Sequence, residues 1–164
     1  MKILRALLVV AVCMSVSPAA HATIVVAADL AELTHDAGTI VRGRVIALDA
    51  RWTDDRRRVE TLITIEAESY LKGTLGTHVQ FRVPGGQLGR FRSIFVGAPT
   101  FVPGQRVVVF LGVRGPSIPF VLGLSQGVFH VEPGDSGWTV MSERRAMPLA
   151  EFERQVRALA GTAR

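Results

Sequence analysis

The sequence predicts a mainly β protein: a small antiparallel barrel of five to seven strands, flanked by a short N-terminal helix and an amphipathic C-terminal helix. Three observations support this fold class. Segments in which apolar and polar residues alternate recur between Thr39 and Met141. Turns rich in Gly and Pro separate these segments. Apolar residues at helical spacing occur before the first strand segment and again after the last one.

The first 22 residues predict a secretory signal peptide. Lys2 and Arg5 precede the apolar stretch Ala6–Val12, and Ala20-His21-Ala22 supplies the small residues that a signal peptidase requires, so cleavage is expected after Ala22. The stretch is shorter than the roughly 20 apolar residues of a membrane-spanning helix. We therefore expect a periplasmic or secreted protein with no transmembrane segment in the mature chain.

The mature chain is expected to form a single domain, residues 23–164. Removing 22 of 164 residues leaves 142, a typical domain size, and one hydrophobic core is expected. Cys13 lies in the leader, so the mature chain has no disulfide, thiolate metal site or cysteine nucleophile. Lipidation of Cys13 is an alternative, which the bulky Val12 disfavours. Without Lys2 and Arg5 the formal charge falls from +5 to +3, and the basic residues are scattered among acids, so no nucleic-acid partner is expected.

The first half of the mature chain predicts a helix and a long hairpin. Leu30 and Leu33 share a helix face, and Gly38 follows where that helix should end. The segments 39–50 and 59–67 both alternate apolar with polar residues, and the turn residues 52–56 join them. Arg56-Arg57-Arg58 is interpreted as a solvated turn. Two antiparallel strands are expected here.

The second half predicts shorter strands and the C-terminal helix. Val79–Val83 is a third strand, and the residues from Gln87 to Gly104 form a structured loop anchored by Phe91, Phe95 and Phe101. Nearly all of 106–113 is apolar and β-branched, which indicates a strand buried on both faces or closing the barrel. Three short returning strands are expected at Phe120–Leu124, Val128–Val131 and Trp138–Met141. The helical spacing of Pro148–Gly161 predicts a C-terminal helix, residues 148–161, that packs on the sheet. A helix lying on a membrane surface is the alternative.

Several segments carry a resemblance to known families. The segments are Ile40–Val45, Tyr70–Gly73, Val83–Gly86, Phe101–Arg106, Val109–Leu111 and Gly123–Val131. They resemble an uncharacterised family of exported bacterial proteins, known mostly as hypothetical proteins, over about Asp29 to Val131. The order of a G-x-V strand, a strand ending in L-K-G and a G-x-x-x-x-x-F strand is also similar to netrin and metalloproteinase-inhibitor barrels of the OB-fold type.

The second resemblance implies an OB-like barrel and a partner-binding or protease-inhibiting role. Inhibitors of that type chelate the protease zinc through an N-terminal cysteine and are held together by disulfides. The predicted mature chain starts at Thr23 and has no cysteine, so any inhibition would need another mechanism.

Four enzyme-like patterns have simpler structural interpretations. Gly134–Gly137 resembles the nucleophile segment of trypsin-like proteases but is typical of a hairpin turn, and no histidine is placed as a base for Ser136. Ser69 and Lys72 have the spacing of penicillin-recognising enzymes, but they end a predicted strand. Pro84–Gly89 matches a phosphate loop only in its glycines. Three histidines show no paired metal-ligand spacing: His35, His78 and His130. No catalytic, cofactor or metal residue is predicted.

The expected function is a non-enzymatic binding module that contacts an exported protein or envelope component through loops at the barrel rim. Binding residues concentrate in loops on rigid scaffolds, and a mixture of arginine and aromatic side chains is typical of interface hot spots. The candidate residues are Arg82, Arg90, Phe91, Arg92 and Phe95. Alternatively, the phenylalanines cap the barrel and the arginines are merely solvated. Two other functions remain open: an inhibitor or accessory protein of an exported protease, and a small hydrolase with a non-local site.

Overall fold

The computed structural model describes residues 29–113, 117–135, 137–142 and 145–162. The predicted signal peptide and its cleavage site lie outside the described residues. The helices are α2 (Leu30–Asp36) and α3 (Leu149–Thr162), and η1 (Leu124–Gly127) is a short 3-10 helix. The strands are β1 (Thr39–Trp52), β2 (Val59–Lys72), β3 (His78–Pro84), β4 (Gly86–Leu88), β5 (Phe91–Ser93), β6 (Arg106–Gly112), β7 (Phe120–Val121), β8 (Val128–Gly134), β9 (Gly137–Ser142) and β10 (Arg145–Pro148).

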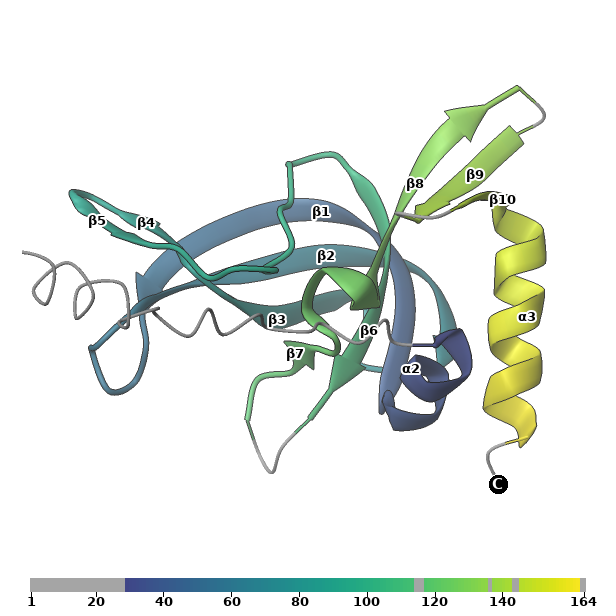
Figure 1. Ribbon diagram of the computed structural model, residues 1–164, viewed down its shortest axis with the longest axis horizontal. Coiled ribbons are helices and arrows are strands. Elements are labelled where there is room, and N and C mark those ends of the chain that lie inside the picture. The colour runs from purple at the N-terminus through teal and green to yellow at the C-terminus, as the bar shows by residue number, and fades with distance from the viewer. Residues whose placement is uncertain (1–28, 114–116, 136, 143–144, 163–164) are drawn as a thin grey trace, which may run out of the picture.

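Five of the strands close into a ring, visible in Figure 1 as the strongly curved centre of the molecule. The order is β1-β2-β3-β7-β6, and β6 pairs back onto β1. Neighbours in the ring are antiparallel except β3 and β7, which run parallel and pair at Arg82 and Phe120. The mainly β fold and the OB-like barrel with flanking helices are therefore confirmed. The strands β8, β9 and β10 extend the sheet beyond the ring.

The long hairpin predicted for the first half of the chain is present as β1 and β2. Trp52 pairs with Val59 at the turn, and Ile40 pairs with Lys72 at the opposite end. Register shifts interrupt the ladder at three places, and such irregularities bend a strand and increase its twist. The bending lets β1 pair with both β2 and β6 and so complete the ring.

The described residues form two buried apolar clusters where one core was expected. On β6, Val107, Val109 and Leu111 belong to the cluster inside the barrel, whereas Val108 and Phe110 belong to a cluster beneath the helices. All five side chains are fully buried. The physical reason is the alternation of side chains along a strand, which sends neighbouring residues to opposite faces. The prediction that this strand is buried on both faces is confirmed.

The C-terminal helix packs against the sheet through the predicted apolar face. Leu149, Phe152 and Val156 are buried in the cluster beneath the helices. The Phe152 ring lies 4.8 Å from that of Phe129, which in turn lies 5.4 Å from that of Phe110. The apolar face is therefore covered by protein, as the sheet-packing prediction required. Within the described part of the chain, neither helix combines the length and hydropathy needed to span a membrane.

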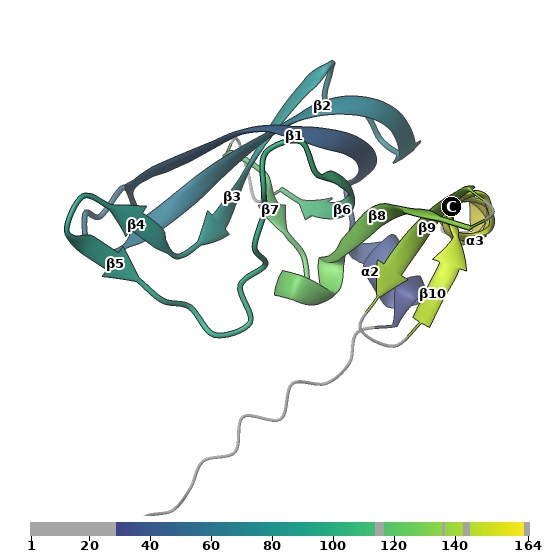
Figure 2. The same ribbon diagram turned by 90° about the horizontal axis from the view of Figure 1, so that it is seen from above.

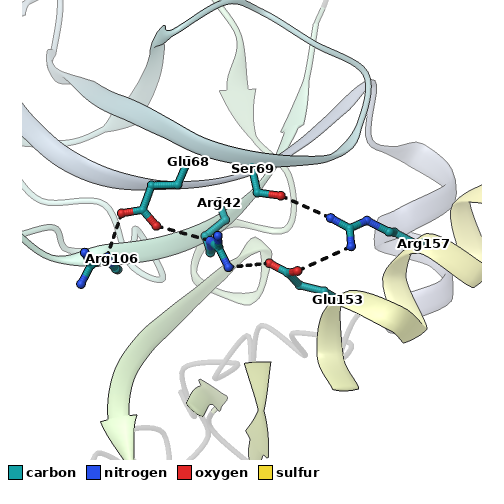
Figure 3. Close-up of polar contacts among 6 residues, drawn as sticks. All are labelled: Arg42, Glu68, Ser69, Arg106, Glu153 and Arg157. Atoms are coloured by element: carbon teal, nitrogen blue, oxygen red, sulfur yellow. Dashed lines mark hydrogen bonds and ion pairs between the residues drawn. The ribbon is translucent and has the colours of Figure 1, made fainter. Parts of the chain in front are cut away.

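A group of charged side chains ties α3 to the barrel wall, as Figure 3 shows. The Arg42 guanidinium donates to Glu153 on α3 at 2.8 Å, and its Nε lies 3.4 Å from Glu68 on β2. That second contact is an ion pair without hydrogen-bond geometry, since the buried Nε makes no hydrogen bond. Glu68 also accepts from Arg106 at 2.8 Å, and Glu153 lies 3.6 Å from Arg157. We call these five residues the arginine network.

Two sequence predictions for the loop and strand regions are corrected. The loop from Gln87 to Gly104 contains the hairpin β4–β5, and of its three predicted phenylalanine anchors only Phe101 is buried, with Phe91 and Phe95 about half exposed. The strand predicted at 120–124 stops after two residues, because Gly123 adopts a left-handed conformation that begins η1. The short strand β10 was not predicted.

Candidate functional site

The predicted contact loop lies at one end of the molecule, far from the helices. Figures 1 and 2 both place the β4–β5 hairpin and the turn between β1 and β2 at the end opposite α2 and α3. The two projections are joined by an edge-to-face contact between the rings of Trp52 and Phe91, whose centroids are 5.1 Å apart. We call residues Trp52–Arg58 and Gly86–Val96 the hairpin end.

The base of the β4–β5 hairpin is fixed to β2 by polar contacts. The Thr61 hydroxyl donates to the Gly85 carbonyl at 2.8 Å, and the Ser93 hydroxyl accepts from the Val59 amide at 2.9 Å. Gly86 has a φ of 144°, and a side chain there would collide with the Thr61 hydroxyl oxygen, so glycine is required. The β4–β5 hairpin therefore carries its side chains on a base that is fixed to β2.

Four of the five predicted site residues come together at the hairpin end. The Arg90 guanidinium lies 5.2 Å from the centre of the Phe91 ring, which is cation-π geometry. Arg92 is exposed, and because side chains alternate along a strand it lies on the face of β5 opposite Phe91. Phe95 follows the hairpin, and its backbone and Cβ approach Gly85. The arginine and aromatic side chains of the prediction are therefore gathered at the hairpin end, although Arg92 and Phe91 lie on opposite faces of β5.

The fifth residue, Arg82, belongs to a different part of the molecule. It is half-buried in β3, where its Nε donates to the Ile118 carbonyl at 3.3 Å and its amide donates to the Pro119 carbonyl at 2.8 Å. These contacts hold the segment that leads into β7. Arg82 thus stabilises the closure of the barrel and takes no part in the arginine and phenylalanine cluster of the hairpin.

The alternative placed Phe91 and Phe95 as barrel caps, but of the three phenylalanines in the loop it is Phe101 that packs inside the barrel. Its ring packs 5.6 Å from that of Phe81 inside the barrel, with 8% of the residue exposed. Phe91 and Phe95 retain 47% and 43% exposure. The three phenylalanines of one loop therefore have two roles, which their sequence context did not distinguish.

Part of this surface was not predicted from the sequence. Ile94 and Val96 are 78% and 90% exposed, more than the predicted phenylalanines. A shallow hollow is lined by Trp52, Thr53, Asp54 and Arg56. One signal was available, since an Ile-Phe-Val run within a Gly- and Pro-rich loop has no strand neighbours to cover it. The proximity of the β1–β2 turn required the tertiary structure.

Local hydrogen bonds lower the pKa of two carboxyl groups on the surface, Asp55 and Glu66. The Thr53 hydroxyl, and secondarily the Arg57 amide, donate to Asp55 and lower the pKa of its carboxyl. On the barrel wall, a hydrogen bond and the positive charge of Arg44 lower the pKa of Glu66. Both carboxylates are held in the ionised form at neutral pH, the opposite of what a general acid requires.

The enzyme-like patterns have structural partners. Lys72 donates to the carbonyls of Thr34 and His35 at the end of α2, and Ser69 accepts from Arg157. Gly134 and Gly137 pair across the β8–β9 hairpin, while Ser136 lies outside the described residues. The strand β4 follows Gly85 directly, where a phosphate loop would need a helix. Among the residues that the structure describes, no three His, Asp or Glu side chains gather as metal ligands.

Comparisons with protein-family models, with curated proteins and with solved structures found no match to this chain. The resemblances to exported bacterial proteins and to netrin-type barrels therefore stay predictions from the sequence.

Proposed function

We propose that this protein is an exported, non-enzymatic binding module that captures an exported or envelope protein through the hairpin end. The observation that carries this proposal is the contiguous run from Phe91 to Val96, in which four large apolar side chains are 43% to 90% exposed. Such side chains gather at protein contact sites, because burying them against a partner removes apolar surface from water.

Three further features support a protein partner. Arg90 precedes the apolar run and Arg92 lies within it, and arginine beside aromatic residues is the composition of interface hot spots. The hairpin is anchored on β2, so little conformational entropy is lost on binding. The predicted signal peptide places the protein in the envelope or the medium, where its partner is expected.

The test is capture of envelope and secreted proteins by the purified protein and by a Phe91→Ala/Ile94→Ser/Val96→Ser variant. We expect a protein that binds the wild-type chain with one-to-one stoichiometry in calorimetry. Its affinity should fall by about 30-fold or more in the variant, the effect of losing one hot-spot side chain or more. A protease as that protein would identify the inhibitor form of the proposal.

The matched control is Leu75→Ser. Leu75 is 40% exposed and lies in the turn that follows β2, at the end of that strand remote from the hairpin end. Its replacement should leave the affinity unchanged. Equal loss in both variants, or a captured protein indifferent to both, contradicts the proposal.

A further inference from the structure

The hairpin end concentrates arginines that have no carboxylate partner. Five arginines lie in this region, and all are exposed: Arg56, Arg57, Arg58, Arg90 and Arg92. The ion pairs between described residues involve none of them. Arg51, one residue before this region, is paired with the buried Glu60 at 2.9 Å. Arg51 is therefore in an ion pair with a carboxylate, whereas the arginines of the adjoining hairpin end are in none with another described residue.

The acidic groups of the hairpin end do not neutralise these arginines. Asp54 and Asp55 are its two acids, so residues 52–58 and 86–96 carry a formal charge of +3, five arginines against two aspartates. Asp55 accepts from the Thr53 hydroxyl and the Arg57 amide, and Arg58 acts on it only as a weaker through-space charge. The guanidinium groups are left available for an external anion.

Apolar and cationic groups alternate over the same surface. The hollow beside Trp52 has Arg56 in its lining, and Arg90 lies over the ring of Phe91, which precedes the exposed Ile94 by three residues. A guanidinium group binds a carboxylate with two parallel hydrogen bonds, and the hollow can receive one bulky side chain. The surface therefore offers positions for carboxylates and for apolar side chains on two projections, the β1–β2 turn and the β4–β5 hairpin, which Figure 1 shows at the same end of the molecule.

We infer that the partner presents an extended acidic segment with interspersed bulky apolar side chains, bound across the β4–β5 hairpin and the β1–β2 turn. This inference rests on the proposed function and specifies the chemistry of the partner. An anionic bilayer is a flat surface, which would bring its negative charge close to Asp54 and leave the hollow unfilled. A peptide can place a side chain in the hollow, so Asp54 and the hollow favour a peptide over a bilayer.

The test is selection of random twelve-residue peptides displayed on phage against the purified full chain. We expect the enriched peptides to carry net negative charge and at least one aromatic or large aliphatic residue. Synthetic copies should bind the Arg90→Glu/Arg92→Glu variant about tenfold or more weakly, and affinity should fall with added salt. The control Arg154→Glu, an exposed α3 arginine outside these ion pairs, should bind as the wild type does.

Three outcomes would overturn the inference. Enrichment of neutral apolar peptides that still require Phe91 and Ile94 rejects the acidic partner but leaves the proposed binding role intact. Equal weakening by Arg154→Glu shows that net charge, not this surface, is responsible. No enrichment, together with sedimentation of the protein on phosphatidylglycerol vesicles but not on phosphatidylcholine vesicles, assigns the surface to an anionic membrane instead.

Discussion

The two ends of the molecule use arginine and phenylalanine in opposite ways. At the helix end, Arg42 and Arg106 are paired with glutamates in the arginine network, and Phe152 is 3% exposed. At the hairpin end, Arg90 and Arg92 form no ion pair with another described residue, and Phe91 is 47% exposed. The same residue types therefore stabilise the fold at one end and are left open to contact at the other.

The difference teaches how to separate structural from functional residues when the contacts of each side chain are known. A half-buried charge is costly to leave unpaired, so a structural arginine is expected to have a nearby carboxylate. An exposed arginine without one contributes little to stability and is free for other contacts. Stability measurements at the two ends, combined with binding, can break or sharpen this contrast.

The largest expected effect is the loss of a buried ring at the helix end. Phe152→Ala should lower the free energy of unfolding by about 3–5 kcal/mol, because it opens a cavity among Phe129, Val156 and their neighbours. Phe91→Ala should lower it by about 1 kcal/mol, the value of its edge contact with Trp52. Urea unfolding followed by circular dichroism measures both. Similar losses for the two variants would remove the distinction between the ends.

The second effect concerns the arginine network. Glu153→Gln leaves Arg42 and Arg157 without this carboxylate. We expect the free energy of unfolding to fall by about 2 kcal/mol, a value between the cost of breaking a buried ion pair and the cost of breaking an exposed one. The controls Arg154→Gln on the same helix and Arg92→Gln at the hairpin end should each change stability by less than about 0.5 kcal/mol. A loss for Arg92→Gln as large as for Glu153→Gln would show that Arg92 has a structural role.

The smallest effect is a local pKa change at the hairpin end. The folded pKa of Asp55 is below its ordinary 3.8, so its stabilising contribution is present above that value and disappears as the pH falls through the lowered pKa. Thr53→Val removes the largest cause and should raise the Asp55 pKa, as followed by NMR titration. Glu66, whose pKa is set by Arg44, should titrate as before. An unchanged Asp55 pKa would mean that the neighbouring arginines, and not the Thr53 hydroxyl, keep the pKa of this carboxyl low.

Most of the fold was predictable because local patterns carry it. Alternation located β1, β2 and β3, a nearly continuous apolar run located β6, and helical spacing located α3, whose residues Leu149, Phe152 and Val156 are buried. The hairpin β4–β5 was predicted only as a loop, because three-residue strands leave no periodicity. Its Gly85 and Gly86 indicated an unusual backbone without showing that the chain folds back onto Thr61.

The candidate site was predictable in part. The sequence identified Arg90, Phe91, Arg92 and Phe95 from composition, and the structure brings these four to one end of the molecule. Arg82 lies apart from this group in the structure, since three-dimensional pairing with the segment before β7 decides its contacts. Trp52 and the arginines of the β1–β2 turn lie more than thirty residues before Arg90 in the chain. They join the site only because the register of the two hairpins brings these segments together.

By itself the sequence determined the β class, the strand buried on both faces and the helix that covers the sheet. Each of these depends on the spacing of apolar residues within one short segment of the chain. Only the tertiary structure decided which arginines are paired and which phenylalanines are exposed. A charge finds its partner across the sheet, as Arg42 finds Glu153 over 111 positions, and burial depends on what packs above a side chain. Both are properties of neighbours in space, which residue spacing along the chain does not record.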